Sequence, residues 1–184
     1  ALAAAGERVL AARDDETREL AARGYQRIVY LGSGALQSLA RESALKVLEL
    51  TAGDIVAYAD SPLGFRHGPK SVLDAKTLAV VYLSDDPYTR RYDEDIALEL
   101  RAALGAENVR VVAGRRSERL GDAGVWYVDG LSGAPDVVLS LPFVLVAQQL
   151  ALRFSLALGH TPDNPFPSGE VNRVVRGVTI YPLP

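Results

Sequence analysis

The stretch "RIVYLGSGALQSLARESALKVLEL", residues 27–50, indicates the class of fold because it joins a strand to a helix through a glycine turn. Its first part, "RIVYL" (27–31), is a β-branched and aromatic run typical of a buried strand. Apolar side chains then recur at helical spacing from Leu36 to Thr51, and Gly53 is expected to end this helix. A buried strand followed by an amphipathic helix is the repeating unit of α/β proteins.

The same alternation continues along the chain. The predicted strands cover 77–83, 109–113 and 125–128, and the predicted helices cover 1–22, 87–104 and 141–158. Strands that alternate with helices predict a parallel sheet covered on both faces, in a three-layer flavodoxin-like α/β fold. Ligands of such sheets bind at the carboxyl ends of the strands.

Composition narrows the classes of protein and of partner. With 184 residues, 48% of them hydrophobic, the chain is long enough for one domain with a sizeable core. A formal net charge of -3 argues against a nucleic-acid partner, which would require a basic surface. The chain has no cysteine, which excludes disulfides and thiolate metal sites and fits a reducing compartment such as the cytoplasm.

Two segments differ in composition from the rest of the predicted domain. The apolar run at 141–158 is about as long as a membrane span, but Gln148, Gln149 and Arg153 interrupt it, so we interpret it as a buried helix and expect no membrane partner. The tail at 161–184 holds five of the ten prolines and is expected to be an extended arm. The chain has no methionine, which either initiator removal or truncation explains.

The turn "LGSG" (31–34) has features of a phosphate-binding loop, since glycines admit a close approach and a helix start presents free N–H groups. A dinucleotide fingerprint needs a third glycine at position 37, which is Gln, so no nicotinamide cofactor is expected. Glycine pairs between a strand and a helix more commonly just make the turn.

Glu42, Lys46 and Glu49 stand at i, i+4 and i+7, so they share one stripe of their helix. Such a stripe is commonly a solvated row of ion pairs. Alternatively, the lysine holds one carboxylate ionised, which a base that removes a proton from carbon requires. Sequence spacing leaves both interpretations open.

His67 lies in "LGFRHGPKS" (63–71), between Arg66 and Lys70. Adjacent cations disfavour a charged imidazole, which leaves a neutral ring that can accept a proton. The alternative is a structural histidine that caps the loop backbone. No second His or Cys stands at metal-ligand spacing, and His160 is remote, so we expect no metal site.

Three segments together, "YLGSGALQSLARESALKVLEL", "GFRHGPKS" and the tail "PSGEVNRVVRGVTIYP", resemble the second sugar-isomerase (SIS) module of tagatose-6-phosphate ketose/aldose isomerases. The similarity covers nearly the whole chain. It implies that residues 1–184 form a single SIS domain, the C-terminal half of a two-module protein. It also implies an active site shared between modules and subunits, hence at least a dimer, and no cofactor.

The resemblance assigns roles residue by residue. Glu49 falls on the proton-transferring carboxylate of the isomerase half of glutamine-fructose-6-phosphate aminotransferase. Lys46 falls on the lysine one turn earlier, and we expect it to bind the substrate. His67 matches the histidine that opens the sugar ring, reached from a neighbouring subunit. Arg176 stands where the aminotransferase has a lysine, and because Arg does not readily form an imine we expect it to bind the substrate. The loop "SDDPYTRR" (84–91) would repel phosphate, which places the phosphate site in the other module.

The family implies a sugar-phosphate isomerase/deaminase, acting on galactosamine 6-phosphate to give tagatose 6-phosphate and ammonia, or on an aldose/ketose 6-phosphate pair. Two alternatives are a regulatory SIS module that only binds a sugar phosphate and the isomerase half of an aminotransferase. The first would need a DNA-binding segment, which is not visible here, and Arg176 disfavours the second.

Overall fold

The computed structural model describes residues 1–169 and 179–183, in which five parallel strands form one sheet in the order β2-β1-β3-β4-β5. The strands are β1 (Arg27–Leu31), β2 (Val56–Asp60), β3 (Thr77–Tyr82), β4 (Val109–Ala113) and β5 (Val125–Tyr127). Every residue of β3 and β4 is buried, as their mainly apolar sequences predict, and in β4 this includes Arg110. This strand order is the flavodoxin-like one, and its direction reverses between β1 and β3.

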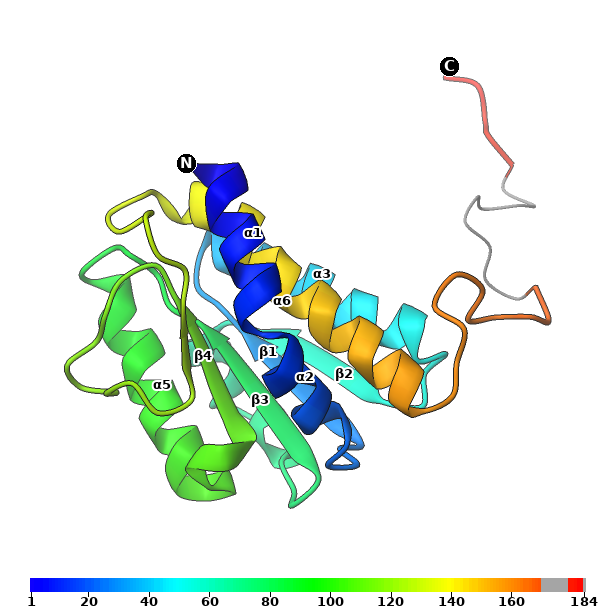
Figure 1. Ribbon diagram of the computed structural model, residues 1–184, viewed down its shortest axis with the longest axis horizontal. Helices are drawn as coiled ribbons and strands as arrows, with labels where there is room; N and C mark the ends of the chain where they lie inside the picture. The colour runs from blue at the N-terminus through cyan, green and yellow to red at the C-terminus, as the bar shows by residue number, and fades with distance from the viewer. Residues whose placement is uncertain (170–178, 184) are drawn as a thin grey trace.

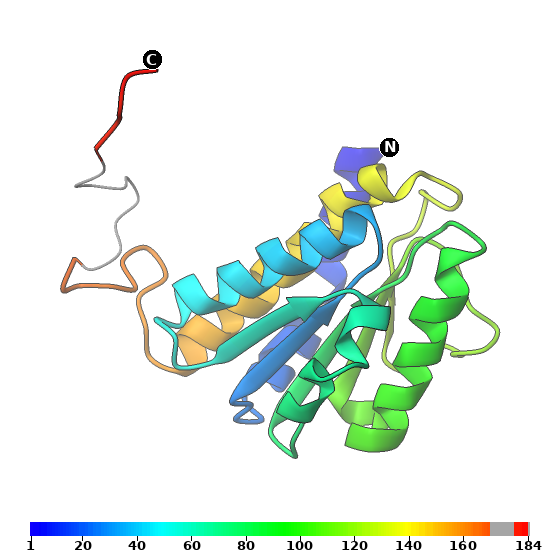
Figure 2. The same ribbon diagram turned by 180° about the vertical axis from the view of Figure 1, so that it is seen from behind.

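Helices cover both faces of the sheet (Figures 1 and 2). They are α1 (Leu2–Ala12), α2 (Asp14–Ala21), α3 (Ala35–Leu50), α4 (Pro62–Phe65), α5 (Thr89–Leu104) and α6 (Asp136–Ala157), with short 3-10 turns η1 (Pro69–Val72) and η2 (Ala106–Asn108). One apolar cluster joins the sheet to α1, α2, α3 and α6, and a second joins the opposite face to α4 and α5. The predicted three-layer α/β fold is therefore confirmed.

Helix α6 is long and apolar enough to span a membrane by length and composition alone. It nevertheless packs against α1, α2 and α3 and buries residues such as Phe143 and Leu150 in the core. Its polar side chains also bind within the domain: Gln149 donates to the carbonyl of Leu10, and Arg153 pairs with Asp14. The interpretation of this segment as a buried helix is confirmed.

Several predicted boundaries were wrong. The first predicted helix is broken at Arg13, and the new helix α2 begins with Asp14, Asp15 and Glu16, whose carboxylates favour a helix N-terminus. Strand β2 was not predicted, because it is an edge strand with no fully buried residue.

Two later helices also begin elsewhere than predicted. Helix α5 begins at Thr89 rather than at Pro87, because the Asp86 carboxylate accepts hydrogen bonds from the backbone of Tyr88 and Thr89. Helix α6 begins at Asp136, five residues before its predicted start.

The C-terminal tail contains neither helix nor strand within 161–169 and 179–183. Ile180, Tyr181 and Leu183 are each more than 80% exposed. The rest of the expected arm lies outside the described residues, and Arg176 is in that part.

Candidate functional site

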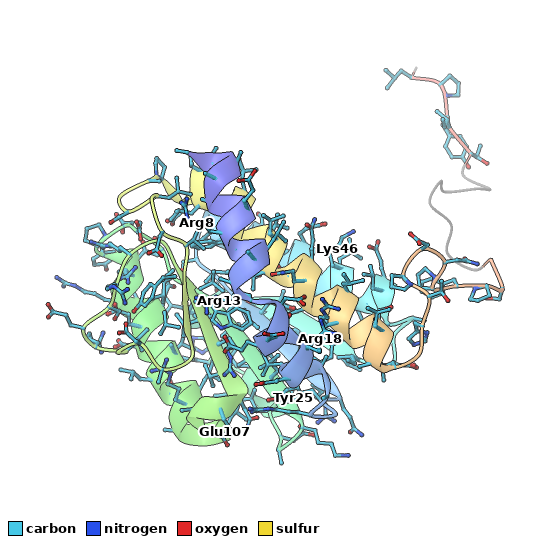
Figure 3. The ribbon with its side chains drawn as sticks, in the orientation of Figure 1. Arg8, Arg13, Arg18, Tyr25, Lys46 and Glu107 are labelled. Atoms are coloured by element: carbon cyan, nitrogen blue, oxygen red, sulfur yellow. The ribbon has the colours of Figure 1, made fainter. Side chains whose placement is uncertain are left out.

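The acidic and basic stripe of α3 forms a connected ion-pair group. The Lys46 ammonium lies 2.6 Å from Glu49 Oε2 and 3.4 Å from Glu42 Oε1. The hydrogen bond to Glu49 raises the pKa of Lys46 above its usual value, so the lysine stays charged. Figure 3 labels Lys46 on α3, and its side chain is 27% exposed while that of Glu49 is 37% exposed. The carboxylate of Glu49 thus has a fixed cationic partner and still reaches the surface.

The end of α3 fixes the place of Glu49 in the fold. The helix starts directly after β1, runs back along the sheet and ends at Leu50, where the Thr51 hydroxyl donates to the carbonyl of Val47. Gly53, with φ +81°, follows the end of the helix, as the sequence predicts, and the chain then enters β2. Glu49 therefore lies near the amino ends of the strands, one helix length away from the "LGSG" turn.

His67 lies between α4 and η1, with an exposed side chain. Its backbone N–H donates to the carbonyl of Gly64 at 3.1 Å. Among residues 1–169 and 179–183, no hydrogen bond or ion pair involves its ring. The ring therefore does not cap the loop backbone within this part of the chain. The ring is instead free to contact a molecule outside this domain.

The two cations beside His67 have a partner of their own on α5. Arg66 Nε lies 3.0 Å from Glu99 Oε2, and Lys70 pairs with the other oxygen of the same carboxylate. The hydrogen bond from Lys70, aided by the charge of Arg66, holds the pKa of Glu99 below its usual value. Glu99 therefore offsets the positive charge of the two cations that flank His67.

Glu49 and His67 lie on opposite faces of the sheet. Helix α3, which carries Glu49, packs in the cluster with α6, whereas Phe65, two residues before His67, is buried in the cluster with α5. The two layers are seen on either side of the strands in Figures 1 and 2. One copy of this domain does not bring the two residues together.

A buried polar group at the carboxyl ends of β1 and β3 was not predicted. Asp93 accepts a hydrogen bond from the Ser33 hydroxyl at 2.5 Å and from the Ser84 backbone N–H at 2.9 Å. The Ser84 hydroxyl in turn donates to Asp136 at 2.6 Å. Burial, with a contribution from the charge of Asp136, raises the pKa of Asp93 to about 6, although both hydrogen bonds and Arg90 act against this rise.

The sequence held one signal for this group: Asp93 continues the apolar stripe of Ile96, Ala97 and Leu100 on α5. A carboxylate in that stripe must be buried and therefore needs partners. Among the residues described, no group of three His, Asp or Glu side chains could hold a metal ion.

Similar known proteins identify the family of this chain, although no family model matches it. The chain is 53% identical over 184 residues to a putative D-galactosamine-6-phosphate deaminase AgaS of Streptomyces coelicolor, covering 99% of the chain and 48% of that protein. It superposes with a TM-score of 0.91 on the crystal structure of a putative tagatose-6-phosphate ketose/aldose isomerase from Clostridium novyi, at 41% identity, covering 99% of this chain and 47% of the other. The chain belongs to the tagatose-6-phosphate ketose/aldose isomerase family.

A second solved member of this isomerase family, from Escherichia coli, gives a TM-score of 0.81 at 42% identity and covers 98% of this chain and 46% of its own. The similarity therefore extends over the whole sheet and both helical layers. The chain spans about half the length of the family members it matches.

Proposed function

We propose that the complete protein converts galactosamine 6-phosphate and water into tagatose 6-phosphate and ammonia. The observation that carries the proposal is the Lys46–Glu49 pair: a partly exposed carboxylate held by an ammonium at 2.6 Å, in a chain 53% identical to a protein named as a galactosamine-6-phosphate deaminase. The crystal structures named as ketose/aldose isomerases support a second candidate, the same proton transfer on a substrate with a 2-hydroxyl group.

In this reaction Glu49 acts as the base. With the ring open, the carboxylate removes the proton from C2, the electrons of that C–H bond form the C1–C2 double bond of an enolamine, and the π electrons of the C1 carbonyl move to its oxygen, which takes a proton from water. Glu49 then returns the proton to C1 as the nitrogen lone pair forms the C2=N bond, and loss of an N–H proton to water leaves an imine at C2. Water adds to this imine and ammonia departs, so that the ketose 6-phosphate remains. Lys46, whose ammonium lies 2.6 Å from this carboxylate, binds the substrate beside it.

His67 has the separate role of opening the pyranose ring, since an imidazole can exchange a proton with a ring hydroxyl near neutral pH. Because His67 and Glu49 lie on opposite faces of this domain, the role requires His67 from a second copy. We therefore propose that the protein is at least a dimer in which the loop at 63–71 reaches the Glu49 of its partner.

The remaining assignments follow from the same reasoning. Arg176 binds the substrate through its ring oxygen or phosphate. The main phosphate site lies in another SIS module, which precedes this one in a two-module protein, because the acidic side chains of the loop after β3 would repel a phosphate. The absence of cysteine from these 184 residues supports a cytoplasmic location.

Ammonia release tests the activity. The complete protein should release ammonia from galactosamine 6-phosphate faster than from glucosamine 6-phosphate. Glu49→Gln should lose about a hundredfold or more of this turnover while it keeps substrate binding, because the amide cannot accept a proton from carbon. Glu42→Gln is the matched control: it alters the same lysine's partners but should leave turnover near that of the unaltered protein. Near-normal turnover in Glu49→Gln would refute the role of the carboxylate.

A second experiment separates the two roles. His67→Asn should slow turnover of the pyranose strongly and recover much of the rate on an open-chain or ring-blocked analogue, because Asn can hydrogen-bond but cannot exchange a proton. Equal loss on both substrates would exclude a role in ring opening. Sedimentation at micromolar concentration tests assembly, and a monomer would count against the shared site.

A further inference from the structure

A cavity lies at the carboxyl end of the sheet, far from Glu49. Its volume is about 320 Å³, at the small end of the range of roughly 300–1,000 Å³ typical of ligand sites. Its lining comes from the turn after β1, the turn after β2 and the start of α5, and includes Ser33, Ser61, Leu63, Tyr88, Thr89 and Tyr92. This place adjoins β1 and β3, between which the strand order reverses, and ligands of such sheets bind at that reversal.

Two backbone donors beside this cavity are already used by one of the chain's own carboxylates: Asp86 accepts hydrogen bonds from the N–H groups of Tyr88 at 3.1 Å and Thr89 at 2.8 Å, at the start of α5. A second carboxylate, Asp93, accepts hydrogen bonds from the Ser33 hydroxyl and the Ser84 backbone N–H. Among the described residues, those that line the cavity include neither Lys nor Arg. A phosphate or carboxylate would therefore meet negative charge with no cationic side chain in the lining to offset it.

The lining suits an uncharged, hydroxyl-bearing ring instead. The Tyr88 and Tyr92 rings stand edge to face, 5.4 Å apart, with their hydroxyls 3.0 Å from each other. That hydrogen bond raises the pKa of Tyr92, and a phenol hydroxyl can both donate and accept, so the pair can bind other hydroxyls. Tyr88 is 67% exposed, which leaves an aromatic face for the C–H side of a sugar. Ser61 and Thr89 add hydroxyls that can donate and accept.

We propose that this cavity is a binding site for an uncharged monosaccharide, bound by stacking on Tyr88 and by hydrogen bonds to the surrounding hydroxyls. The site is distinct from the one at Glu49, because Glu49 lies near the amino ends of the strands and this cavity lies at their carboxyl ends. It recognises the sugar ring without its phosphate, and so it responds to a compound that the proposed reaction does not consume.

Fluorine NMR of the full-length protein labelled with 3-fluorotyrosine tests the proposal, with D-galactose as the probe. The resonances of Tyr88 and Tyr92, assigned by replacing each with Phe, should shift in a saturable way, and those of the buried Tyr30 and Tyr82 should not. Tyr88→Ala should weaken galactose binding about three- to tenfold, as expected for the loss of one aromatic contact. Inorganic phosphate should leave all four resonances in place.

Three results would overturn the proposal: no shift with galactose up to its solubility limit, a shift with inorganic phosphate, or undiminished binding in Tyr88→Ala. The outcome is independent of the proposed reaction. Galactose should bind equally in Glu49→Gln, and Tyr88→Ala should still release ammonia, so failure of one proposal leaves the other standing.

Discussion

Replacing Asp93 by Asn should change how the stability of the domain depends on pH. Burial raises the pKa of this carboxyl to about 6 from a usual value of 3.8. The folded state therefore binds the proton more tightly than the unfolded chain between these two values. The free energy of unfolding must fall as pH rises through that window, and the loss is complete above the folded pKa.

The size of the effect follows from the two pKa values. Relative to low pH, where the carboxyl is protonated in both states, a shift from 3.8 to about 6 lowers the free energy of unfolding by about 1.6 kcal/mol at pH 5 and by about 3 kcal/mol at pH 8. Asp93 should thus remove about 1.4 kcal/mol of stability between pH 5 and pH 8. An Asn at this position does not ionise, and it can keep both contacts: its Oδ1 accepts from the Ser84 N–H and its Nδ2 donates to the Ser33 hydroxyl.

Urea unfolding followed by circular dichroism at pH 5 and pH 8 measures the difference. The stability of Asp93→Asn relative to the natural sequence should improve by about 1.4 kcal/mol on going from pH 5 to pH 8. Asp129→Asn is the control, since Asp129 is exposed, and its relative stability should not change with pH. A relative stability of Asp93→Asn that stays constant or falls over this range would refute the reasoning.

Three further substitutions test the core and the turns by urea unfolding at constant pH. Arg90→Met should cost about 3–5 kcal/mol, because the buried guanidinium binds Glu94 at 3.1 Å and two or more backbone carbonyls. Phe143→Ala should cost about 3–5 kcal/mol, whereas Val137→Ala on the same helix, at a 64% exposed position, should cost less than about 0.5 kcal/mol. Gly34→Ala should cost roughly 1–3 kcal/mol through its positive φ alone, since no atom lies within 4 Å of the added Cβ. Equal losses for Phe143→Ala and Val137→Ala, or no loss for Gly34→Ala or Arg90→Met, would contradict these assignments.

Those parts of the fold that the sequence could predict were the ones with a continuous burial pattern. Strands β1, β3 and β4 are buried on both faces and are largely apolar, although β4 contains Arg110. The edge strand β2 is a short apolar segment with no fully buried residue, and its Val56 is 57% exposed. The Lys46–Glu49 contact was predictable because spacing on a helix fixes which side chains meet. The contacts of Asp93 could not be predicted in the same way. They form because the turns after β1 and β3 lie side by side, and only the strand order shows that these turns are neighbours.

Because β2 was not predicted, the sequence did not show that Glu49 and His67 lie on opposite faces of the sheet. Connections between parallel strands are right-handed, so the direction in which a chain moves along the sheet decides which face its helix covers. Without β2, α3 would connect β1 to β3 and would lie on the same face as α5, which connects β3 to β4. With β2 on the far side of β1, α3 moves in the opposite direction and must cover the opposite face. The path from β2 back to β3, which carries His67, then returns over the α5 face. The strand order alone thus separates the proposed base from the proposed ring-opening group, and a site that uses both must be built from more than one copy.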